Sequence, residues 1–156
     1  MRRPQPLRWS ENRYQAMSEL AGLFPTLETA SGVKPWKVTQ FVRWAIFHGH
    51  CSGSAHAVRF LLSVWNPDSD WREILKEAKA SHEDQTLYQT MLQLRKEAAA
   101  YLSETLQRTP TEAQIQKDVE ERLELFRPFN LSDAVAVWDA EHRAALSAWI
   151  NDPFWP

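Results

Sequence analysis

Residues 36–65, WKVTQFVRWAIFHGHCSGSAHAVRFLLSVW, decide the fold. On both sides of the polar segment HGHCSGS, residues 48–54, apolar residues recur three and four positions apart, which is the pattern of amphipathic helices. So short a connection requires the two helices to pack as neighbours, and we expect them to be antiparallel. We therefore expect a core built around this pair. The positions that predict it are Phe41, Val42, Ala45, Ile46, Val58, Leu61, Leu62 and Trp65.

The composition of the whole chain favours the same helical class. Its 156 residues are 44% hydrophobic and 24% charged, which is typical of a globular protein and excludes wholesale disorder. Only four glycines and little alternation of β-branched residues favour helices over sheets. Eight tryptophans bring large apolar rings, which usually lie at helix crossings or on binding surfaces. We predict an all-α fold with a compact core of five or more helices and a long helical hairpin in the middle of the chain.

The hairpin is predicted from a change of character at Asp68. From there the sequence is more charged and rich in Glu, Gln, Lys and Ala, which form helices well. Apolar residues at alternating steps of four and three predict residues 83–107 to pack against 111–126. We interpret the chain, residues 1–156, as a single helical domain. In this interpretation 1–67 and 128–156 form the core, and 68–127 form an inserted hairpin or arm.

Residues at the expected helix ends predict where the helices begin and stop. Ser, Thr and Asp accept backbone N–H groups at the N-cap, proline fits the first turn, and glycine after the last turn accommodates positive φ. We expect a first helix from Ser10 to about Phe24, and an inward-facing stripe on the last helix at Leu146, Trp149 and Ile150. Phe154 and Trp155 are expected to fold back onto the core. The remaining end signals are Pro35 in a first turn, Gly49 with positive φ, and N-caps at Ser52 or Ser54, Thr109, Ser132 or Asp133, and Asp139.

The net charge of −2 conceals an uneven distribution. Residues 1–67 carry a net charge of +5, residues 68–127 carry −4 and residues 128–156 carry −3. A basic first third either meets phosphates or packs on the acidic remainder of its own chain. No stretch approaches the ~18 apolar residues of a membrane span, and nothing resembles an export signal. A single cysteine excludes an intramolecular disulfide. We expect a cytoplasmic protein without a membrane partner.

Residue types that can bind a metal or act in nucleophilic catalysis are concentrated in the helix connection, residues 48–54, and at its neighbour His56. His48, His50, Cys51 and His56 are zinc-binding types, but His50 and Cys51 are adjacent and no second ligand pair follows. The spacing therefore does not favour a metal, and we expect no cofactor.

A cysteine nucleophile is a second hypothesis for the same segment. Cys51 precedes a helix N-terminus, where the dipole and free N–H groups favour the thiolate, and His50 lies beside it. Asp139 and His142 lie three positions apart on one helix face, so they could supply an orienting carboxylate and a base. The alternative is a small buried cysteine at a helix connection.

Anion or nucleic-acid binding is the third hypothesis. Ser52, Gly53 and Ser54 open a helix, so their N–H groups could hold a phosphate beside His56 and Arg59. Near the start of the basic first third, Arg8 and Arg13 are interleaved with aromatic residues, as in nucleic-acid binders.

Most of the helix connection is also explained by ending one helix and beginning the next. We therefore expect a small, non-enzymatic interaction or regulatory module that binds another protein, or itself, through aromatic surface. Nucleic-acid binding through the first third is the alternative. An enzyme centred on residues 48–56, using Cys and His or a metal, is the second alternative.

Overall fold

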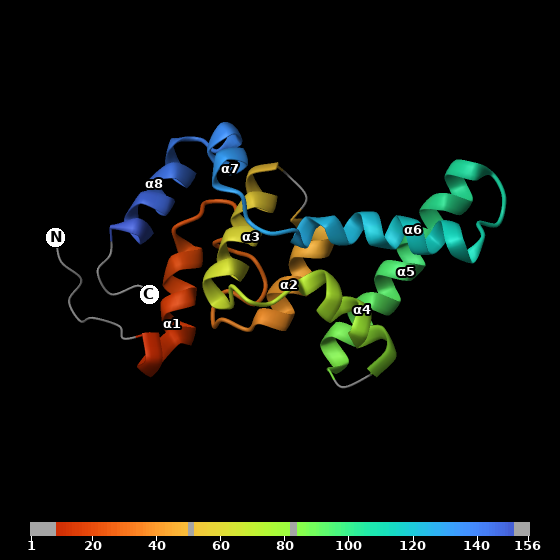
Figure 1. Ribbon diagram of the computed structural model, residues 1–156, viewed down its shortest axis with the longest axis horizontal. Helices are drawn as coiled ribbons and strands as arrows, with labels where there is room; N and C mark the ends of the chain where they lie inside the picture. Colours follow the sequence, from red (N-terminus) through yellow and green to blue (C-terminus); the bar gives the residue numbers. More distant parts are fainter. Residues whose placement is uncertain (1–8, 50–51, 82–83, 152–156) are drawn as a thin grey trace. The chain divides into compact units, whose positions relative to one another are not determined.

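The computed structural model describes residues 9–49, 52–81 and 84–151, and over these residues the protein is all-α (Figure 1). Eight α-helices and one 3-10 helix occur in this part of the chain, and it contains no strand beyond an isolated bridge between Val33 and Trp36. The predicted fold class is therefore confirmed. The elements are α1 (Trp9–Gly22), α2 (Val38–His48), α3 (Ser52–Trp65), α4 (Trp71–Ser81), α5 (Gln85–Leu106), α6 (Glu112–Leu123), η1 (Glu124–Phe126), α7 (Leu131–Val137) and α8 (Ala140–Ile150).

The chain forms two compact units. Unit 1 combines Met1–Pro67 with Phe129–Pro156, and unit 2 is the continuous segment Asp68–Pro128. The division lies where the composition changes at Asp68 and where Pro128 follows the hairpin. A compact unit need not be an independently folding domain, so the interpretation of the chain as a single domain stays a prediction.

Unit 1 is assembled around α3, which contacts α1, α2 and α7. Its centre is aromatic: the Phe60 ring lies 5.7 Å from that of Phe24, 6.4 Å from that of Trp138 and 5.1 Å from that of Trp149, between centroids. Ring pairs at this separation add to the free energy gained by burial alone. Phe60 therefore joins residues from both ends of the sequence in one core.

Unit 2 is a three-helix packing in which α5 contacts both α4 and α6. The α5/α6 pair is the predicted hairpin. Its buried positions are Leu87, Met91, Leu94 and Ala98 on α5 and Ile115, Val119 and Leu123 on α6. Tyr101 continues the same spacing on α5, but it is 55% exposed, with the Arg122 guanidinium 5.7 Å from its ring centroid.

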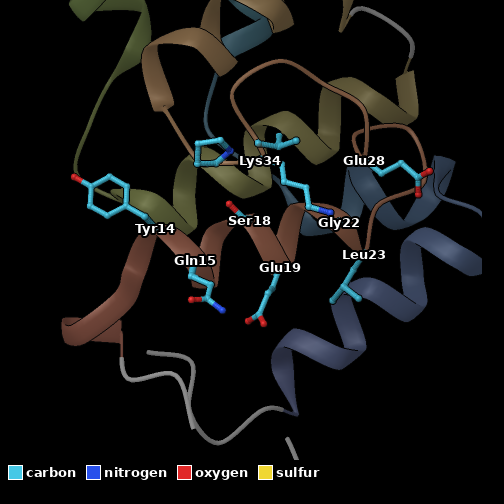
Figure 2. Close-up of a pocket in the computed structure, with 10 residues that line it drawn as sticks. Tyr14, Gln15, Ser18, Glu19, Gly22, Leu23, Glu28 and Lys34 are labelled. Atoms are coloured by element: carbon cyan, nitrogen blue, oxygen red, sulfur yellow. The ribbon is translucent and has the colours of Figure 1, made fainter. Parts of the chain in front are cut away.

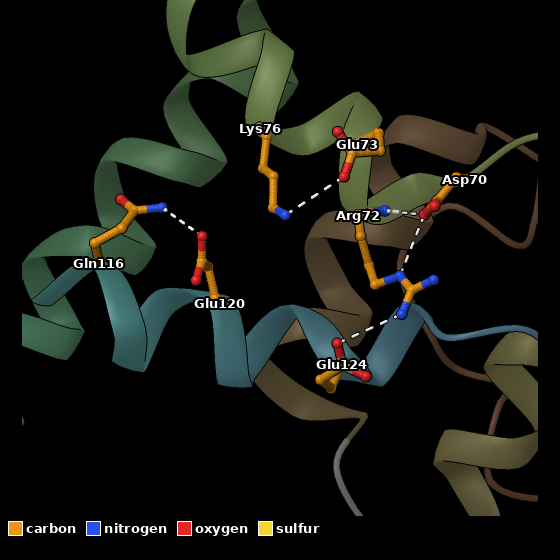
Figure 3. A network of polar contacts seen from close by, with 7 residues as sticks. All are labelled: Asp70, Arg72, Glu73, Lys76, Gln116, Glu120 and Glu124. Carbon is orange, nitrogen blue, oxygen red and sulfur yellow. Dashed lines mark hydrogen bonds and ion pairs between the residues drawn. The ribbon is translucent and has the colours of Figure 1, made fainter. Parts of the chain in front are cut away.

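A polar network at the start of α4 joins that helix to η1 (Figure 3). Asp70 Oδ1 accepts hydrogen bonds from the backbone N–H (3.0 Å) and Nε (3.3 Å) of Arg72, and Arg72 Nη1 donates to Glu124 at 3.4 Å. Although burial raises it, the pKa of Asp70 is lowered overall, chiefly by the hydrogen bonds from Arg72. The carboxylate thus caps α4 and holds the cation that reaches η1.

Several predicted helix ends are wrong by one to three residues. α1 includes Ser10 and ends at Gly22, and Ser54 lies inside α3 rather than before it. Thr111, not Thr109, caps α6 in a reciprocal box with Gln114. Asn130 caps α7 in place of Ser132 or Asp133, by accepting the Asp133 N–H, whereas the cap at Asp139 is confirmed.

Two backbone predictions around α2 are also wrong. Pro35 precedes α2 by three residues, in a turn, and its peptide bond with Lys34 is cis. Gly49 has φ of −97°, so it does not need a left-handed conformation; positive φ occurs instead at Gly32, with φ of 85°. A side chain at Gly49 is excluded by space, since a Cβ there would lie 2.8 Å from the Ala45 carbonyl oxygen.

Fewer side chains of α8 point into the core than the sequence predicts. Leu146 is buried and Trp149 is half-buried, but Ile150 is 60% exposed, which corrects its predicted inward orientation. Phe154 and Trp155 lie outside the described residues.

Candidate functional site

The helix connection, residues 48–54, is only partly described. His50 and Cys51 lie outside the described residues, so the pair at the centre of the metal and nucleophile hypotheses is not placed. His48 is exposed at the end of α2, and its ring centroid lies 6.3 Å from that of Trp44. His56 is buried within α3, with its Nδ1 3.4 Å from Arg59 Nη1.

The metal hypothesis gains no support from the described residues. In that part of the chain no three His, Cys, Asp or Glu side chains lie close enough together to hold a metal ion. A set that includes His50 or Cys51 falls outside this statement, so the metal hypothesis stays a prediction.

The first turn of α3, predicted as an anion site, contacts the α7–α8 junction. The Trp138 indole N–H donates to the Gly53 carbonyl oxygen at 3.0 Å, and Ser54 is buried. The sequence offered no sign of this bond, because the two residues are 85 positions apart. Anion binding by Ser52, Gly53 and Ser54 stays a prediction.

Arg13 contributes to the packing of unit 1. Its guanidinium lies 3.7 Å from the centroid of the Trp65 ring, and Nη2 donates to the Trp65 carbonyl oxygen at 2.7 Å. A stacked guanidinium is typical of a cation–π contact. The two residues and Trp149 line a groove of about 570 Å³. Arg8 lies outside the described residues.

The side chains of Asp139, the N-cap of α8, and His142 in its first turn are in contact, and a third residue joins them. Asp139 Oδ1 accepts the backbone N–H of His142 at 3.0 Å and lies 2.9 Å from its Nδ1. On the other side of the ring, Nε2 lies 3.2 Å from the hydroxyl of Thr26. The imidazole is only 4% exposed, between the rings of Phe24 and Trp138. The backbone N–H of His142 lowers the pKa of Asp139 most, and the imidazole lowers it further.

This hydroxyl–imidazole–carboxylate chain has the order of groups found in nucleophilic hydrolases. It also has a sufficient structural role, because Asp139 caps α8 and His142 ties that helix to the loop after α1. Thr26 was missed in the sequence, since 116 positions separate it from His142. None of these three residues lines the groove at Arg13, Trp65 and Trp149, and none lines the groove along α1.

A larger groove follows the exposed face of α1 (Figure 2). This α1 groove has a volume of about 890 Å³ and lies between α1 and residues 28–35. Its lining residues are Tyr14, Gln15, Ser18, Glu19, Gly22, Leu23, Glu28, Val33, Lys34 and Pro35.

Local sequence explains the shape of the α1 groove. Ala16, Met17, Leu20 and Ala21 face the core, whereas Tyr14, Ser18 and Gly22, spaced by four, form a row along the groove. Tyr14 is 58% exposed and Leu23 is 48% exposed. A Cβ at Gly22 would meet no atom within 4 Å. The groove therefore has open space beside Gly22 and apolar side chains at Tyr14 and Leu23.

Comparisons with protein-family models, with curated proteins and with solved structures found no match. Among the described helices, none has both the length and the apolar content required to cross a membrane.

Proposed function

We propose that this protein is a small, non-enzymatic interaction module that binds another protein through the α1 groove. The observation that carries the proposal is the exposure of Tyr14 and Leu23 beside a groove of about 890 Å³. In the same unit the rings of Phe24, Phe41, Phe60 and Trp138 are buried. An apolar surface next to a formed groove is a common property of docking sites.

The chemistry of the α1 groove favours an amphipathic helix as the bound segment. A helix face that is small at Ser18 and Gly22 lets a second helix approach closely, in the way that helices pack ridge into groove. Burying apolar surface on docking is favourable, and it must exceed the cost of lost translational and rotational freedom. Glu19, Glu28 and Lys34 supply charges that orient the partner.

The sequence predicts binding through aromatic surface in general, and the proposal assigns that binding to the α1 groove. Among the described residues, the aromatic side chains with large exposure are Tyr14 and Tyr101, and only Tyr14 lines the α1 groove. The nucleic-acid alternative has less support, because Arg13 and Arg59 contact Trp65 and His56 within unit 1.

Site-specific photo-crosslinking in the cells that make the protein tests the proposal. A photoreactive phenylalanine analogue replaces Leu23, and we expect a discrete protein adduct. Gly22→Arg in the same chain should abolish the adduct, because Gly22 lines the α1 groove and a long side chain there occupies open space without touching the core. The matched control places the analogue at Ser103, an exposed position on α5. Adducts that form equally at both positions, or that survive Gly22→Arg, would overturn the proposal.

A further inference from the structure

We propose that the Thr26 hydroxyl is a covalent acceptor for small activated acyl esters, from which it takes the acyl group and keeps it as a stable ester. The inference goes beyond the proposed function and does not depend on it, since Thr26 does not line the α1 groove. Three observations carry it: the order of the groups behind the hydroxyl, the exposed turn that presents it, and the backbone N–H of the same residue.

The contacts of the His142 ring make Nε2 the nitrogen that accepts a proton from Thr26. Asp139 Oδ1 lies 2.9 Å from Nδ1, and the Asp139 carboxyl is ionised because the backbone N–H of His142 lowers its pKa. A carboxylate only accepts hydrogen bonds, so in the neutral imidazole Nδ1 carries the proton and Nε2 keeps its lone pair. Nε2 lies 3.2 Å from Thr26 Oγ1, and the hydroxyl therefore donates to it.

A tight turn holds Thr26 in front of this nitrogen. The Leu27 N–H donates to the Phe24 carbonyl oxygen at 3.0 Å, so residues 24–27 form a turn with Pro25 at its second position, where proline fits well. Phe24 and Leu27 are buried at the two ends of the turn, whereas Thr26 is exposed. The core thus fixes the hydroxyl while solutes can reach it, and little conformational freedom is lost when it reacts.

The backbone of Thr26 supplies a donor for the charge that develops during acyl transfer. Attack on an ester places negative charge on the carbonyl oxygen, which backbone N–H groups stabilise, the N–H of the nucleophile among them. Within the described part of the chain the Thr26 N–H donates no hydrogen bond. It is therefore not committed to another acceptor.

The transfer needs only the ester and the side chains named above. The Thr26 oxygen forms a bond to the carbonyl carbon of the ester as its proton passes to Nε2. The bond from that carbon to the leaving oxygen then breaks, and the leaving oxygen takes the proton back from the imidazolium. An alcohol or a phenol is released, and the acyl group remains on Thr26 Oγ1.

The surroundings of Thr26 favour a small acyl group that is retained. Neither the α1 groove nor the groove at Arg13 is lined by Thr26, so neither offers it a binding surface for a long acyl chain. Hydrolysis of the ester requires a water molecule to reach Nε2. The His142 side chain is only 4% exposed, and the acylated Thr26 stands in front of that nitrogen. We therefore expect one acylation per chain rather than continued turnover.

The test incubates the full chain with p-nitrophenyl acetate, in a background with Cys51 replaced by Ser to remove the only thiol. Peptide mass spectrometry locates the acetyl groups, and alkaline hydroxylamine separates esters, which it cleaves, from the amides formed on lysines. We expect a hydroxylamine-sensitive acetyl group at Thr26. Thr26→Val should abolish it, whereas Thr26→Ser should retain it. Thr29→Val, at an exposed threonine three residues on, is the matched control and should leave it unchanged.

Asp139→Asn tests the contribution of the groups behind the hydroxyl. The amide can donate to Nδ1 and leave the proton on Nε2, so acetylation of Thr26 should be at least about tenfold slower. Glu141→Gln, an exposed change in the same helix, should not alter the rate. Circular dichroism checks that the helices are retained in each variant.

Three results would overturn the inference. The first is an ester at Thr26 that forms no faster than one at Thr29, and the second is a rate indifferent to Asp139→Asn. The third is continued release of p-nitrophenol that depends on Thr26, because the acyl group would then be hydrolysed rather than kept.

Discussion

Gly49 is buried at the end of α2, and its role is steric rather than conformational. Its N–H donates to the Ala45 carbonyl oxygen at 2.7 Å, so the chain passes close over the preceding turn. An added Cβ would lie 2.8 Å from that oxygen and 3.1 Å from the Ala45 Cα. Because both atoms belong to the backbone, neither can rotate away.

We expect Gly49→Ala to lower the free energy of unfolding by about 1–3 kcal/mol, the usual cost of overpacking a tight site. Gly53→Ala is the matched control, since a Cβ at Gly53 meets nothing within 4 Å in the first turn of α3. That change should be neutral or stabilising by up to about 1 kcal/mol. Urea unfolding followed by circular dichroism measures both, and equal effects would contradict the steric explanation.

Asp139 links stability to pH. Its pKa is lowered in the folded state by the backbone N–H and the ring of His142. A lowered folded-state pKa means that the stabilisation is present above the unfolded value of about 4 and is lost as the pH falls through the folded value. Asp139→Asn should therefore unfold at a lower temperature than wild type near neutral pH.

The same difference between Asp139→Asn and wild type should shrink in acid. Thermal unfolding at a series of pH values measures it. Glu104→Gln, an exposed change in the last turn of α5, serves as the control for removing one carboxylate. A difference in melting temperature that stays constant from neutral pH into acid would show that Asp139 does not stabilise the protein through its charge.

At the scale of elements, the start of α6 offers a direct comparison between two threonines. The Thr111 hydroxyl accepts the Gln114 N–H at 3.2 Å, and Gln114 Oε1 accepts the Thr111 N–H at 2.9 Å. We expect Thr111→Ala to lower the free energy of unfolding by about 1 kcal/mol. Thr109→Ala should change it little, because Thr109 lies outside the helix. Chemical denaturation separates the two, and the reverse order would contradict this cap.

This threonine pair also shows what the sequence predicts about helices and what it does not. Thr109 and Thr111 each stand three residues before an acid or amide, Glu112 and Gln114, so both match the capping-box pattern. Periodicity predicts that a helix exists here, since it depends on many residues. Its first residue depends on a single competition between neighbouring caps, which local sequence does not resolve.

The candidate site was harder to predict than the fold. Asp139 is the N-cap of α8 and His142 lies three residues on, so their spacing predicts that they meet. Thr26 joins them only because the loop after α1 packs against α8, and no local pattern encodes that contact. The α1 groove was missed for a similar reason. It is formed where residues 28–35 lie beside α1, and no local pattern predicts how that segment packs against the helix.

At the scale of the whole molecule, Phe60 connects segments from both ends of unit 1. Its ring meets Phe24 of the early chain and Phe129, Trp138 and Trp149 of the late chain. We expect Phe60→Ala to lower the free energy of unfolding by about 3–5 kcal/mol, the cost of a large cavity in a core.

Leu92→Ala in unit 2 is the control for Phe60→Ala, because Leu92 is 38% exposed whereas Phe60 is 2% exposed, so its truncation removes less buried surface. Tryptophan fluorescence during denaturation measures both variants. A loss at Phe60 no larger than that at Leu92 would mean that these ring contacts do not hold unit 1 together.

The discontinuity of unit 1 has a consequence for synthesis on the ribosome. Residues 1–67 leave the exit tunnel first, but α7 and α8, which complete the packing around Phe60, are translated after the whole of unit 2. At about 5–20 residues per second, translating the intervening segment takes roughly 3–12 s. During that interval the apolar face of α3 is exposed on the nascent chain, because α7 and α8 do not yet cover it. Unit 2 is continuous, so its core can form as soon as residues 68–128 have emerged. Translation of unit 1 begins first, but the core of unit 1 can close only after that of unit 2.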